Sequence, residues 1–199
     1  MSLRLWLVRH GATEWSAAGR HTSTTDLSLT EAGRDAALAA GKALEGKEFS
    51  LVLTSPMSRA RETADLAGLG AQAVVDANLR EWDYGEVEGL TTDQIREKVP
   101  GWTVWRDGCP GGESIEAVGD RADEVIARTK AIDVADGDVV IFAHGHLLRI
   151  LGARWIEQEP GFAERLLLST AAICVLGWER ETPAVERWND TSHLTPHPS

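Results

Sequence analysis

Short apolar runs alternate with longer amphipathic stretches along most of the chain, and this alternation constrains the fold more than any other feature. Short apolar runs bounded by glycine and polar residues are typical of buried strands, and an apolar residue every third or fourth position is typical of helices. The pattern predicts strands over residues 3–8, 50–54, 73–75, 138–143, 171–178 and 184–188. It predicts helices over residues 30–44, 55–66, 91–99, 113–132 and 147–156. Such alternation indicates a three-layer α/β/α sandwich on a mostly parallel sheet.

Local signals mark two helix starts and one chain end. Thr30 is the expected N-cap of its helix, and Pro56 falls where the first turn of a helix tolerates proline. No repeat or Pro/Gly/Ser-rich linker divides the 199 residues, so we expect one domain over residues 1–188. Pro196 and Pro198 interrupt regular structure, which predicts a polar tail over residues 189–199.

Acidic residues outnumber basic ones, at 31 against 20, for a formal net charge of −11. Nucleic acids and anionic membranes bind basic surfaces, so the charge argues against both as partners. A few arginines gathered in one cleft would still bind a small anionic substrate.

Cysteine usage and hydropathy point to the cytoplasm. Cys109 and Cys174 form no metal-spaced pair and suggest no disulfide framework, which favours a reducing compartment. The first apolar run meets Arg9 and His10 too early for a signal-peptide core. The longest largely apolar stretch, residues 166–178, is shorter than the roughly 20 residues of a membrane-spanning helix. A homo-oligomer remains open.

Charged residues gather where the predicted strands end, and in open α/β sheets the ligand crevice lies beyond the carboxyl ends of the strands. Arg9 and His10 end the first strand, Arg59 follows the second, Glu81 follows the third, and His144 ends the fourth. Arginine suits phosphate, and an imidazole can carry a phosphoryl group. A carboxylic acid can protonate a leaving alkoxide and then activate water. These residues predict phosphomonoester hydrolysis without a metal or another cofactor.

Five segments, in this order, carry a resemblance to a known family. They are residues 7–15 (LVRHGATEW), 26–33 (DLSLTEAG), 54–64 (TSPMSRARETA), the segment around Glu81, and residues 142–146 (FAHGH). Over residues 3–178 the chain resembles the histidine phosphatase superfamily, branch 1, the phosphoglycerate-mutase-like group. The resemblance implies that fold, with His10 as phosphohistidine nucleophile and Glu81 as proton donor. It also implies that Arg9, Arg59 and His144 grip the phosphoryl oxygens.

A subgroup of that family shows further similarity. Residues 19–22, 80–89 and 105–109 resemble fungal sedoheptulose-1,7-bisphosphatase and related actinobacterial acid phosphatases. The substrate-binding residues that we assign from it are His21, Thr22, Tyr84, Arg106, Gly145 and His146. His21 stands where the fungal enzyme has a phenol side chain, and Ser16 stands where phosphoglycerate mutases have asparagine. We expect His21 and Thr22 to meet sugar hydroxyls and Arg106 to meet a second phosphate.

Several of these assignments have plainer alternatives. Glu81 could lie in a solvated acidic loop, Arg59 could pair with Glu62 on a helix surface, and Arg106 could pair with Asp107.

Histidines and cysteines offer further alternatives. His146 could merely cap the helix that follows it, and it could join His10, His21 and His144 in a metal site. Cys174 and Arg180 have the spacing of a cysteine phosphatase, but a strand pattern separates them where a phosphate loop would be needed.

The sequence therefore predicts a metal-independent phosphomonoesterase that acts on a small phosphorylated metabolite. Sugar phosphates or bisphosphates, such as sedoheptulose 1,7-bisphosphate, are the expected substrates. The alternatives are a broad-specificity acid phosphatase, a phosphoglycerate mutase, and a non-catalytic protein that binds phosphorylated ligands.

Overall fold

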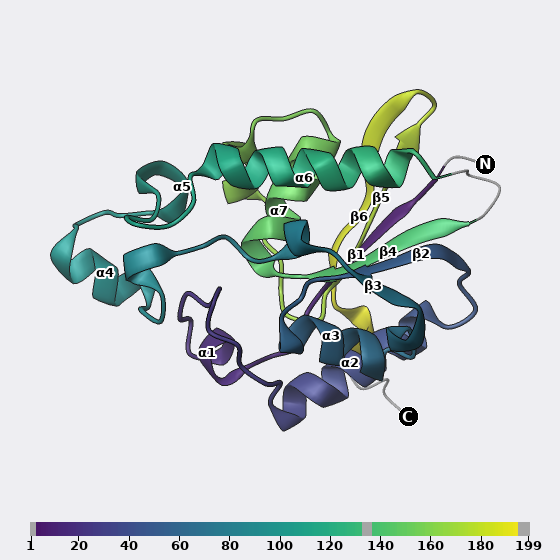
Figure 1. Ribbon diagram of the computed structural model, residues 1–199, viewed down its shortest axis with the longest axis horizontal. Coiled ribbons are helices and arrows are strands. Elements are labelled where there is room, and N and C mark those ends of the chain that lie inside the picture. Colours follow the sequence, from purple (N-terminus) through teal and green to yellow (C-terminus); the bar gives the residue numbers. More distant parts are fainter. Residues whose placement is uncertain (1–2, 133–136, 195–199) are drawn as a thin grey trace.

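Six strands form one mixed sheet in the computed structural model, which describes residues 3–132 and 137–194 (Figure 1). The strands are β1 (Leu5–Arg9), β2 (Phe49–Thr54), β3 (Ala73–Val75), β4 (Asp138–Ala143), β5 (Ile173–Glu179) and β6 (Thr182–Asp190), in the spatial order β3-β2-β4-β1-β5-β6. The pairs β3–β2, β2–β4 and β4–β1 are parallel, whereas β1–β5 and β5–β6 are antiparallel. The predicted mostly parallel sheet is confirmed.

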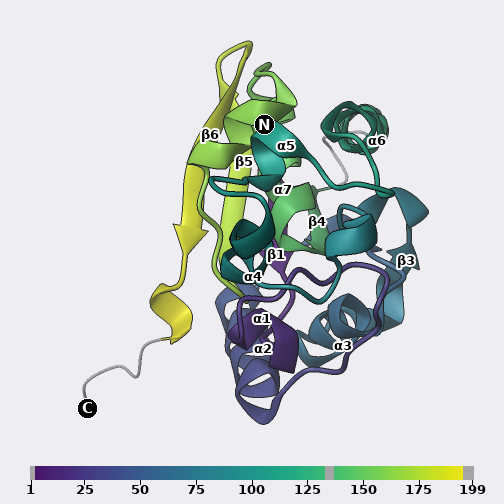
Figure 2. The same cartoon turned by 90° about the vertical axis from the view of Figure 1, so that its left-hand side faces the viewer.

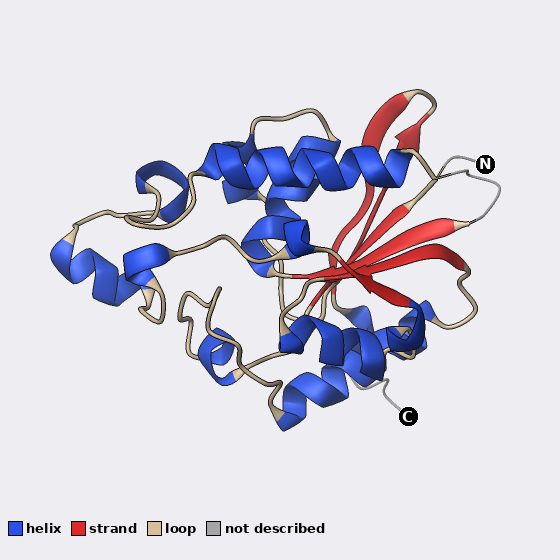
Figure 3. Cartoon of the chain, in the orientation of Figure 1, coloured by secondary structure: helices blue, strands red, loops and turns tan. Residues whose placement is uncertain are grey.

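Helices cover both faces of the sheet and complete the three layers (Figures 1 and 3). α2 (Glu31–Leu44) and α3 (Ser58–Leu66) lie on one face, and α6 (Ile115–Lys130) and α7 (Gly145–Trp155) lie on the other. The short helices α1 (Glu14–Ala17), α4 (Thr92–Lys98) and α5 (Val104–Asp107) lie to the left in Figure 1. The 3-10 helices are η1 (Gly70–Gln72), η2 (Ala77–Leu79), η3 (Gly85–Val87), η5 (Pro160–Arg165) and η6 (Ser192–Leu194). Within the described ranges, no helix has the length and apolar character needed to cross a membrane.

The side chains of β1 alternate between two hydrophobic clusters. Leu5 and Leu7 belong to the cluster that includes the apolar residues of α6 and α7, whereas Trp6 and Val8 belong to the cluster with α2 and α3. Both faces of the strand are therefore buried, which explains why it reads as a continuous apolar run.

The start of α3 differs from the prediction. The helix begins at Ser58 with Met57 as its N-cap, so the prediction that Pro56 lies in the first helical turn is wrong. The backbone N–H and the hydroxyl of Ser58 both donate to Asp26 Oδ1, at 2.9 and 2.8 Å. This contact with a distant loop fixes the start of the helix, and no local pattern reveals it.

The loop after β1 and the start of α2 touch through their backbones. Thr30 is the N-cap, as predicted, and its hydroxyl accepts the N–H of Gly33 at 3.0 Å. A Cβ at Gly33 would lie 2.2 Å from the carbonyl oxygen of Ala12, and a Cβ at Gly11 would lie 2.2 Å from that of Gly33. Only glycine fits at both positions, and the absence of side chains there lets the loop that follows β1 lie directly against the start of α2.

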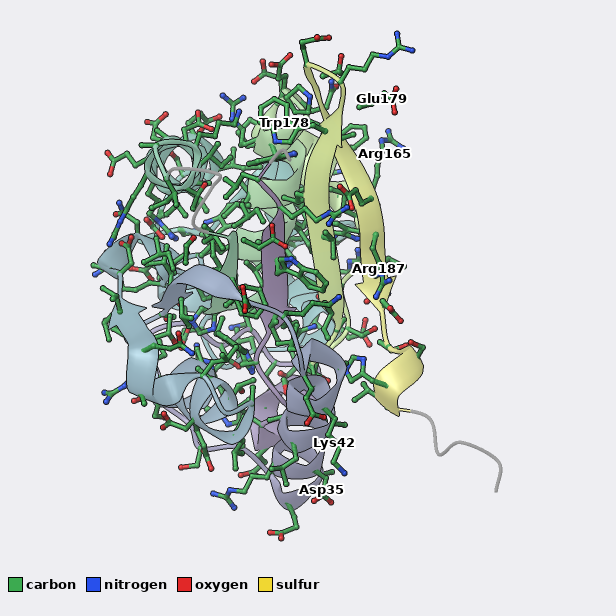
Figure 4. The ribbon with its side chains drawn as sticks, turned by 90° about the vertical axis from the view of Figure 1, so that its right-hand side faces the viewer. Asp35, Lys42, Arg165, Trp178, Glu179 and Arg187 are labelled. Carbon is green, nitrogen blue, oxygen red and sulfur yellow. The ribbon has the colours of Figure 1, made fainter. Side chains whose placement is uncertain are left out.

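The last strand extends into the predicted tail. Asp190 pairs with Ile173 of β5, and the side chain of Asn189 accepts the N–H of Ser169 at 2.7 Å. The predicted boundary at residue 188 is therefore too early, and residues 195–199 lie outside the described ranges. Figure 4 shows β6, with Arg187 labelled, at the outer edge of the sheet. An edge strand carries polar side chains, which is why its end looks like a tail in sequence.

Candidate active site

A cavity of about 430 Å³ lies beyond the carboxyl ends of β1 and β4. Short helices α1, α4 and α5, seen at the front of Figure 2, contribute to its walls. The cavity is lined by most of the residues that the sequence assigns to the site: Arg9, His10, His21, Thr22, Glu81, Tyr84, Gly145 and His146. Arg59 and His144 are fully buried and lie outside the cavity lining. Parallel strand ends thus bring together residues up to 137 positions apart, from Arg9 to His146, as predicted.

His10 presents one ring nitrogen for chemistry. Its backbone N–H donates to Ala143 O at 2.9 Å, which joins the ends of β1 and β4. Its Nδ1 lies 2.7 Å from Gly11 O, and since a carbonyl only accepts, Nδ1 carries the proton and Nε2 keeps its lone pair. Burial, reinforced by the charges of Arg9 and Arg59, holds the pKa of His10 well below its ordinary value. The imidazole is therefore neutral at neutral pH.

Two guanidinium groups beside His10 are held mainly by main-chain carbonyls. Arg9 Nη1 donates to Leu168 O at 2.6 Å. Arg59 donates to Thr25 O at 3.1 Å and to Ser23 O at 3.0 Å, and Asp26 lies 3.8 Å from it. Burial lowers the pKa of both arginines, but carbonyl contacts leave their positive charge largely unneutralised.

His144 adds a neutral imidazole to the two arginines beside His10. It is the N-cap of α7, and its ring centroid lies 5.1 Å from that of His10. Its Nε2 lies 2.7 Å from Ser55 Oγ, so a hydroxyl that donates there leaves the proton on Nδ1. Burial, followed by the charge of Arg59, holds the pKa of His144 well below its ordinary value.

Three buried nitrogens of these side chains share one property. Among the described residues, Arg9 Nε, Arg59 Nε and His144 Nδ1 are buried side-chain atoms that no protein group accepts from or donates to. Buried polar groups are otherwise almost always hydrogen-bonded, so this set calls for an acceptor from outside the chain. An oxyanion with several acceptor oxygens, such as a phosphoryl group, fits it.

Glu81 is fixed at both carboxylate oxygens. Oε1 accepts the N–H groups of Trp82 and Leu147 at 3.0 and 2.9 Å, and Oε2 accepts that of His146 at 3.1 Å. The residue is only 6% exposed, and it lines the cavity together with Tyr84, whereas Trp82 lies in the core behind it. The alternative of a solvated acidic loop is therefore wrong for Glu81.

Glu88, from the same acidic stretch, also has a structural partner. Its carboxylate accepts the N–H groups of Ser23 and Thr25 at 2.9 and 3.0 Å. The carbonyls of these same two residues bind Arg59. Glu88 thus orders the loop that orients the Arg59 guanidinium.

Aromatic rings form the wall away from His10. The Tyr84 hydroxyl is hydrogen-bonded to His146 Nδ1, and the His21 ring lies 4.9 Å from that of Tyr84 and 5.4 Å from that of Trp102. The His146 ring lies 4.9 Å from that of Trp105. Because His144 is the N-cap of α7, the alternative that His146 caps this helix is wrong.

Arg106 does not reach the cavity. Its guanidinium binds Asp107 at 3.1 and 2.8 Å and Gly101 O at 2.6 Å, and its side chain is 65% exposed. The assignment of Arg106 to the substrate site is therefore corrected to a surface ion pair. Three other arginines line the cavity, namely Arg20, Arg96 and Arg149. Arg149 lies one turn into the helix that follows the fourth strand, so the strand-end rule already places it at the crevice, whereas Arg20 and Arg96 have no role in the sequence prediction.

Neither rival chemistry finds a matching arrangement in the described residues. They contain no group of three or more His, Cys, Asp or Glu side chains placed to hold a metal ion. Cys174 lies in the core of β5, where burial raises the pKa of its thiol to about 12, so it is no reactive thiolate.

Known proteins are similar to this chain in sequence and in fold. The model of the histidine phosphatase superfamily (branch 1) matches residues 5–191. An acid phosphatase of Mycobacterium tuberculosis is 42% identical over 195 residues, which cover 97% of this chain and 95% of the relative. The sedoheptulose 1,7-bisphosphatase of Saccharomyces cerevisiae is 37% identical over 181 residues, with 76% and 67% covered. A solved structure from Mycobacterium tuberculosis, 41% identical, superposes with a TM-score of 0.89 over 94% of this chain and 97% of its own.

The buried histidines make stability depend on pH. Burial holds the pKa values of His10, His144 and His146 below the ordinary 6.5, whereas in the unfolded chain they titrate near it. As pH falls below that value, only the unfolded chain takes up these protons. The free energy of unfolding should therefore fall by up to about 1.4 kcal/mol per pH unit for each histidine. Urea unfolding at several pH values between about 7.5 and 5 measures this slope.

A substitution isolates one of these protons. His144→Gln should reduce the slope of unfolding free energy against pH by the contribution of one proton, up to about 1.4 kcal/mol per pH unit. The core variant Ile150→Val is the control, because it should lower the free energy of unfolding by about 1 kcal/mol equally at every pH. A wild-type slope in His144→Gln would contradict the neutral, buried state of His144.

The unpartnered nitrogens predict an anion site. Inorganic phosphate should raise the Tm of the protein at constant ionic strength, because it binds the folded chain alone. Arg59→Met should abolish this rise, whereas Arg61→Met, an exposed position on the same helix, should retain it. Differential scanning fluorimetry with phosphate against chloride measures both. An undiminished rise in Arg59→Met would place the anion elsewhere.

Proposed function

The chain belongs to the histidine phosphatase superfamily, branch 1, and from that membership we propose that it hydrolyses phosphomonoesters through a phosphohistidine at His10. One feature of the site supports this activity above all. A neutral imidazole with a free Nε2 lies among three buried nitrogens that lack an acceptor in the described chain. This arrangement joins a nucleophile to a cradle for the phosphoryl oxygens.

In the first step the phosphoryl group moves to His10. The Nε2 lone pair forms the N–P bond while the P–O bond to the leaving alkoxide breaks, and Glu81 gives its proton to that oxygen. Arg9, Arg59 and the Nδ1–H of His144 stabilise the charge on the transferring oxygens. The two guanidinium groups and this N–H donor supply the stabilisation that metal ions give in other phosphatases.

In the second step water releases the phosphate. The Glu81 carboxylate takes a proton from water as the water oxygen bonds to phosphorus, and the N–P electron pair returns to Nε2. Both steps use one carboxyl group in alternate protonation states, which requires that its position relative to His10 be fixed. The three N–H groups on its oxygens support that requirement.

Sugar phosphates or bisphosphates are the substrates that we propose, with sedoheptulose 1,7-bisphosphate as the example. The cavity has room beyond the reacting phosphate, and hydroxyl and imidazole groups of Thr22 and His21 line it. A bisphosphatase and an acid phosphatase are among the relatives of the chain, so a broad-specificity acid phosphatase is the second candidate.

Arg149 replaces Arg106 as the site for a second phosphate. It lines the cavity, its Cζ lies 4.4 Å from the centroid of the Trp105 ring, and it donates to the carbonyls of Ala163 and Glu164 at 3.1 and 3.2 Å. Burial lowers the pKa of Arg149 to about 10, which still leaves it charged at neutral pH. A partly buried cation with carbonyl partners favours an anion opposite it.

Loss of the nucleophile and of the acid tests the mechanism. His10→Ala should release no phosphate above background and should incorporate no labelled phosphate. Glu81→Gln should lower kcat on alkyl phosphates by about 10²-fold or more, and much less on p-nitrophenyl phosphate, whose leaving group needs little protonation. Hydrolysis by His10→Ala, or equal losses of Glu81→Gln on both substrates, would contradict these roles.

A pair of arginine variants tests the substrate class. Arg149→Met should lower kcat/KM by about 10-fold or more on a ketose bisphosphate and by less than about 3-fold on the matching monophosphate. Arg106→Ala is the control and should treat both substrates as the wild type does. Equal rates on both substrates in every variant would leave the broad-specificity phosphatase.

A further inference from the structure

The segment that carries Glu81 has little regular structure of its own. Residues 78–83, named here the acid segment, run from within η2 to just before η3, and none of them belongs to a strand. Leu79 and Trp82 are fully buried, so the backbone between them lies largely away from water. Main-chain carbonyls in such a place need partners from elsewhere in the fold.

Arg121 of α6 supplies most of those partners. Its Nη1 donates to Asn78 O and Arg80 O at 2.7 and 2.8 Å, and its Nη2 donates to Glu81 O at 3.2 Å. Its Nε and Nη2 donate to the two carboxylate oxygens of Glu113, both at 2.9 Å. All five N–H donors of the guanidinium are thereby used, and three of them fix carbonyls of the acid segment.

Glu113 binds the same segment from its other end. Its Oε2 accepts the N–H of Asp83 at 2.9 Å, and its backbone N–H donates to Asp83 O at 3.0 Å. Its carbonyl accepts the indole N–H of Trp82 at 3.0 Å. Burial acts to raise the pKa of Glu113, but hydrogen bonds from Arg121 and Asp83 outweigh it and lower that pKa. The Glu113 carboxyl group is therefore ionised at neutral pH.

Two separate anchors thus determine where the Glu81 carboxyl group lies. The start of α7 holds its oxygens through the N–H groups of His146 and Leu147, and the Arg121–Glu113 pair holds its main chain. Arg121 itself does not line the cavity, and its guanidinium binds the main-chain carbonyl of Glu81 rather than the carboxyl oxygens. Proton transfer tolerates little displacement, so the backbone anchor matters to the proton transfers of Glu81 and not to the attack of His10 on phosphorus.

We propose that Arg121, through its pair with Glu113, is a positioning residue for the acid Glu81. This role presupposes the proposed phosphatase mechanism. It predicts a specific defect: transfer of the phosphoryl group to His10 persists when the leaving group needs little protonation and slows when Glu81 must protonate an alkoxide. A merely structural role would instead reduce activity on every substrate alike.

The test compares leaving groups. Arg121→Lys keeps the charge but loses the planar fork that binds three carbonyls and a carboxylate together. It should lower kcat on glycerol phosphate by about 10-fold or more and kcat on p-nitrophenyl phosphate by less than about 3-fold. Glu113→Gln should show the same selective loss. The double variant should lose little more than either single one, because both changes break one pair.

A similar ion pair provides the control. Arg154 of α7 binds Asp123 of α6 through Nε and Nη2, at 2.9 and 2.7 Å, in the same forked geometry but on the surface. Arg154→Lys should leave the ratio of the two rates unchanged. Thermal unfolding verifies that each variant folds. If Arg121→Lys does not fold, Glu113→Gln alone tests the positioning role.

The outcomes separate the two proposals. Equal losses on both substrates in folded variants would overturn the positioning role of Arg121 and leave the phosphatase mechanism intact. A wild-type protein that hydrolyses neither substrate would overturn the proposed function itself, and the positioning role with it.

Discussion

The burial of two guanidinium groups beside a neutral histidine is the constraint on which the rest of the site depends. Arg9 and Arg59 are held largely by carbonyls, so their charge is oriented but not cancelled. Their positive charge, together with burial, keeps His10 unprotonated and leaves its Nε2 available. An anion that enters this place meets donors already in position, which removes the reorganisation that water would impose. The sheet makes this possible, since the ends of β1 and β4 meet at one edge.

Two charged side chains behind the site, Glu88 and Arg121, act on its reacting groups through the backbone and not by pairing with them directly. Glu88 binds the N–H groups of a loop whose carbonyls bind Arg59, and Arg121 binds the carbonyls of the segment that carries Glu81. A carboxylate hydrogen-bonded to Arg59, closer than Asp26 at 3.8 Å, would cancel more of the charge that a phosphoryl group needs, and a guanidinium on the Glu81 carboxyl group would oppose its protonation. A peptide group lies between Glu88 and Arg59, and another between Arg121 and the Glu81 carboxyl group. Arg59 and Glu81 are thereby oriented without losing their chemical function.

The sequence predicts the reacting end of the site better than its other end. Arg9, His10 and His144 lie at the ends of parallel strands, which the sheet brings together directly, and Glu81 follows the third strand along the same edge. The far wall depends on the path of residues 84–112, in which the sequence pattern predicts only the helix over residues 91–99. In α5 the neighbours Trp105 and Arg106 face different surroundings, and only Trp105 lines the cavity. The start of α3 at Ser58 depends on Asp26, a contact that no local signal announces.

The two ends of the cavity come from different parts of the chain. Strand ends and the start of α7 provide the reacting end, whereas α4, α5 and the loop at residues 19–22 provide much of the remainder. Two backbone hydrogen bonds join the loop at residues 19–22 to the segment before α4: the N–H of His21 donates to Leu90 O, and the N–H of Gly89 donates to His21 O. Insertions or substitutions there can be inherited without disturbing the sheet. Such a scaffold can acquire new substrates over evolutionary time while it keeps one ancestral chemistry.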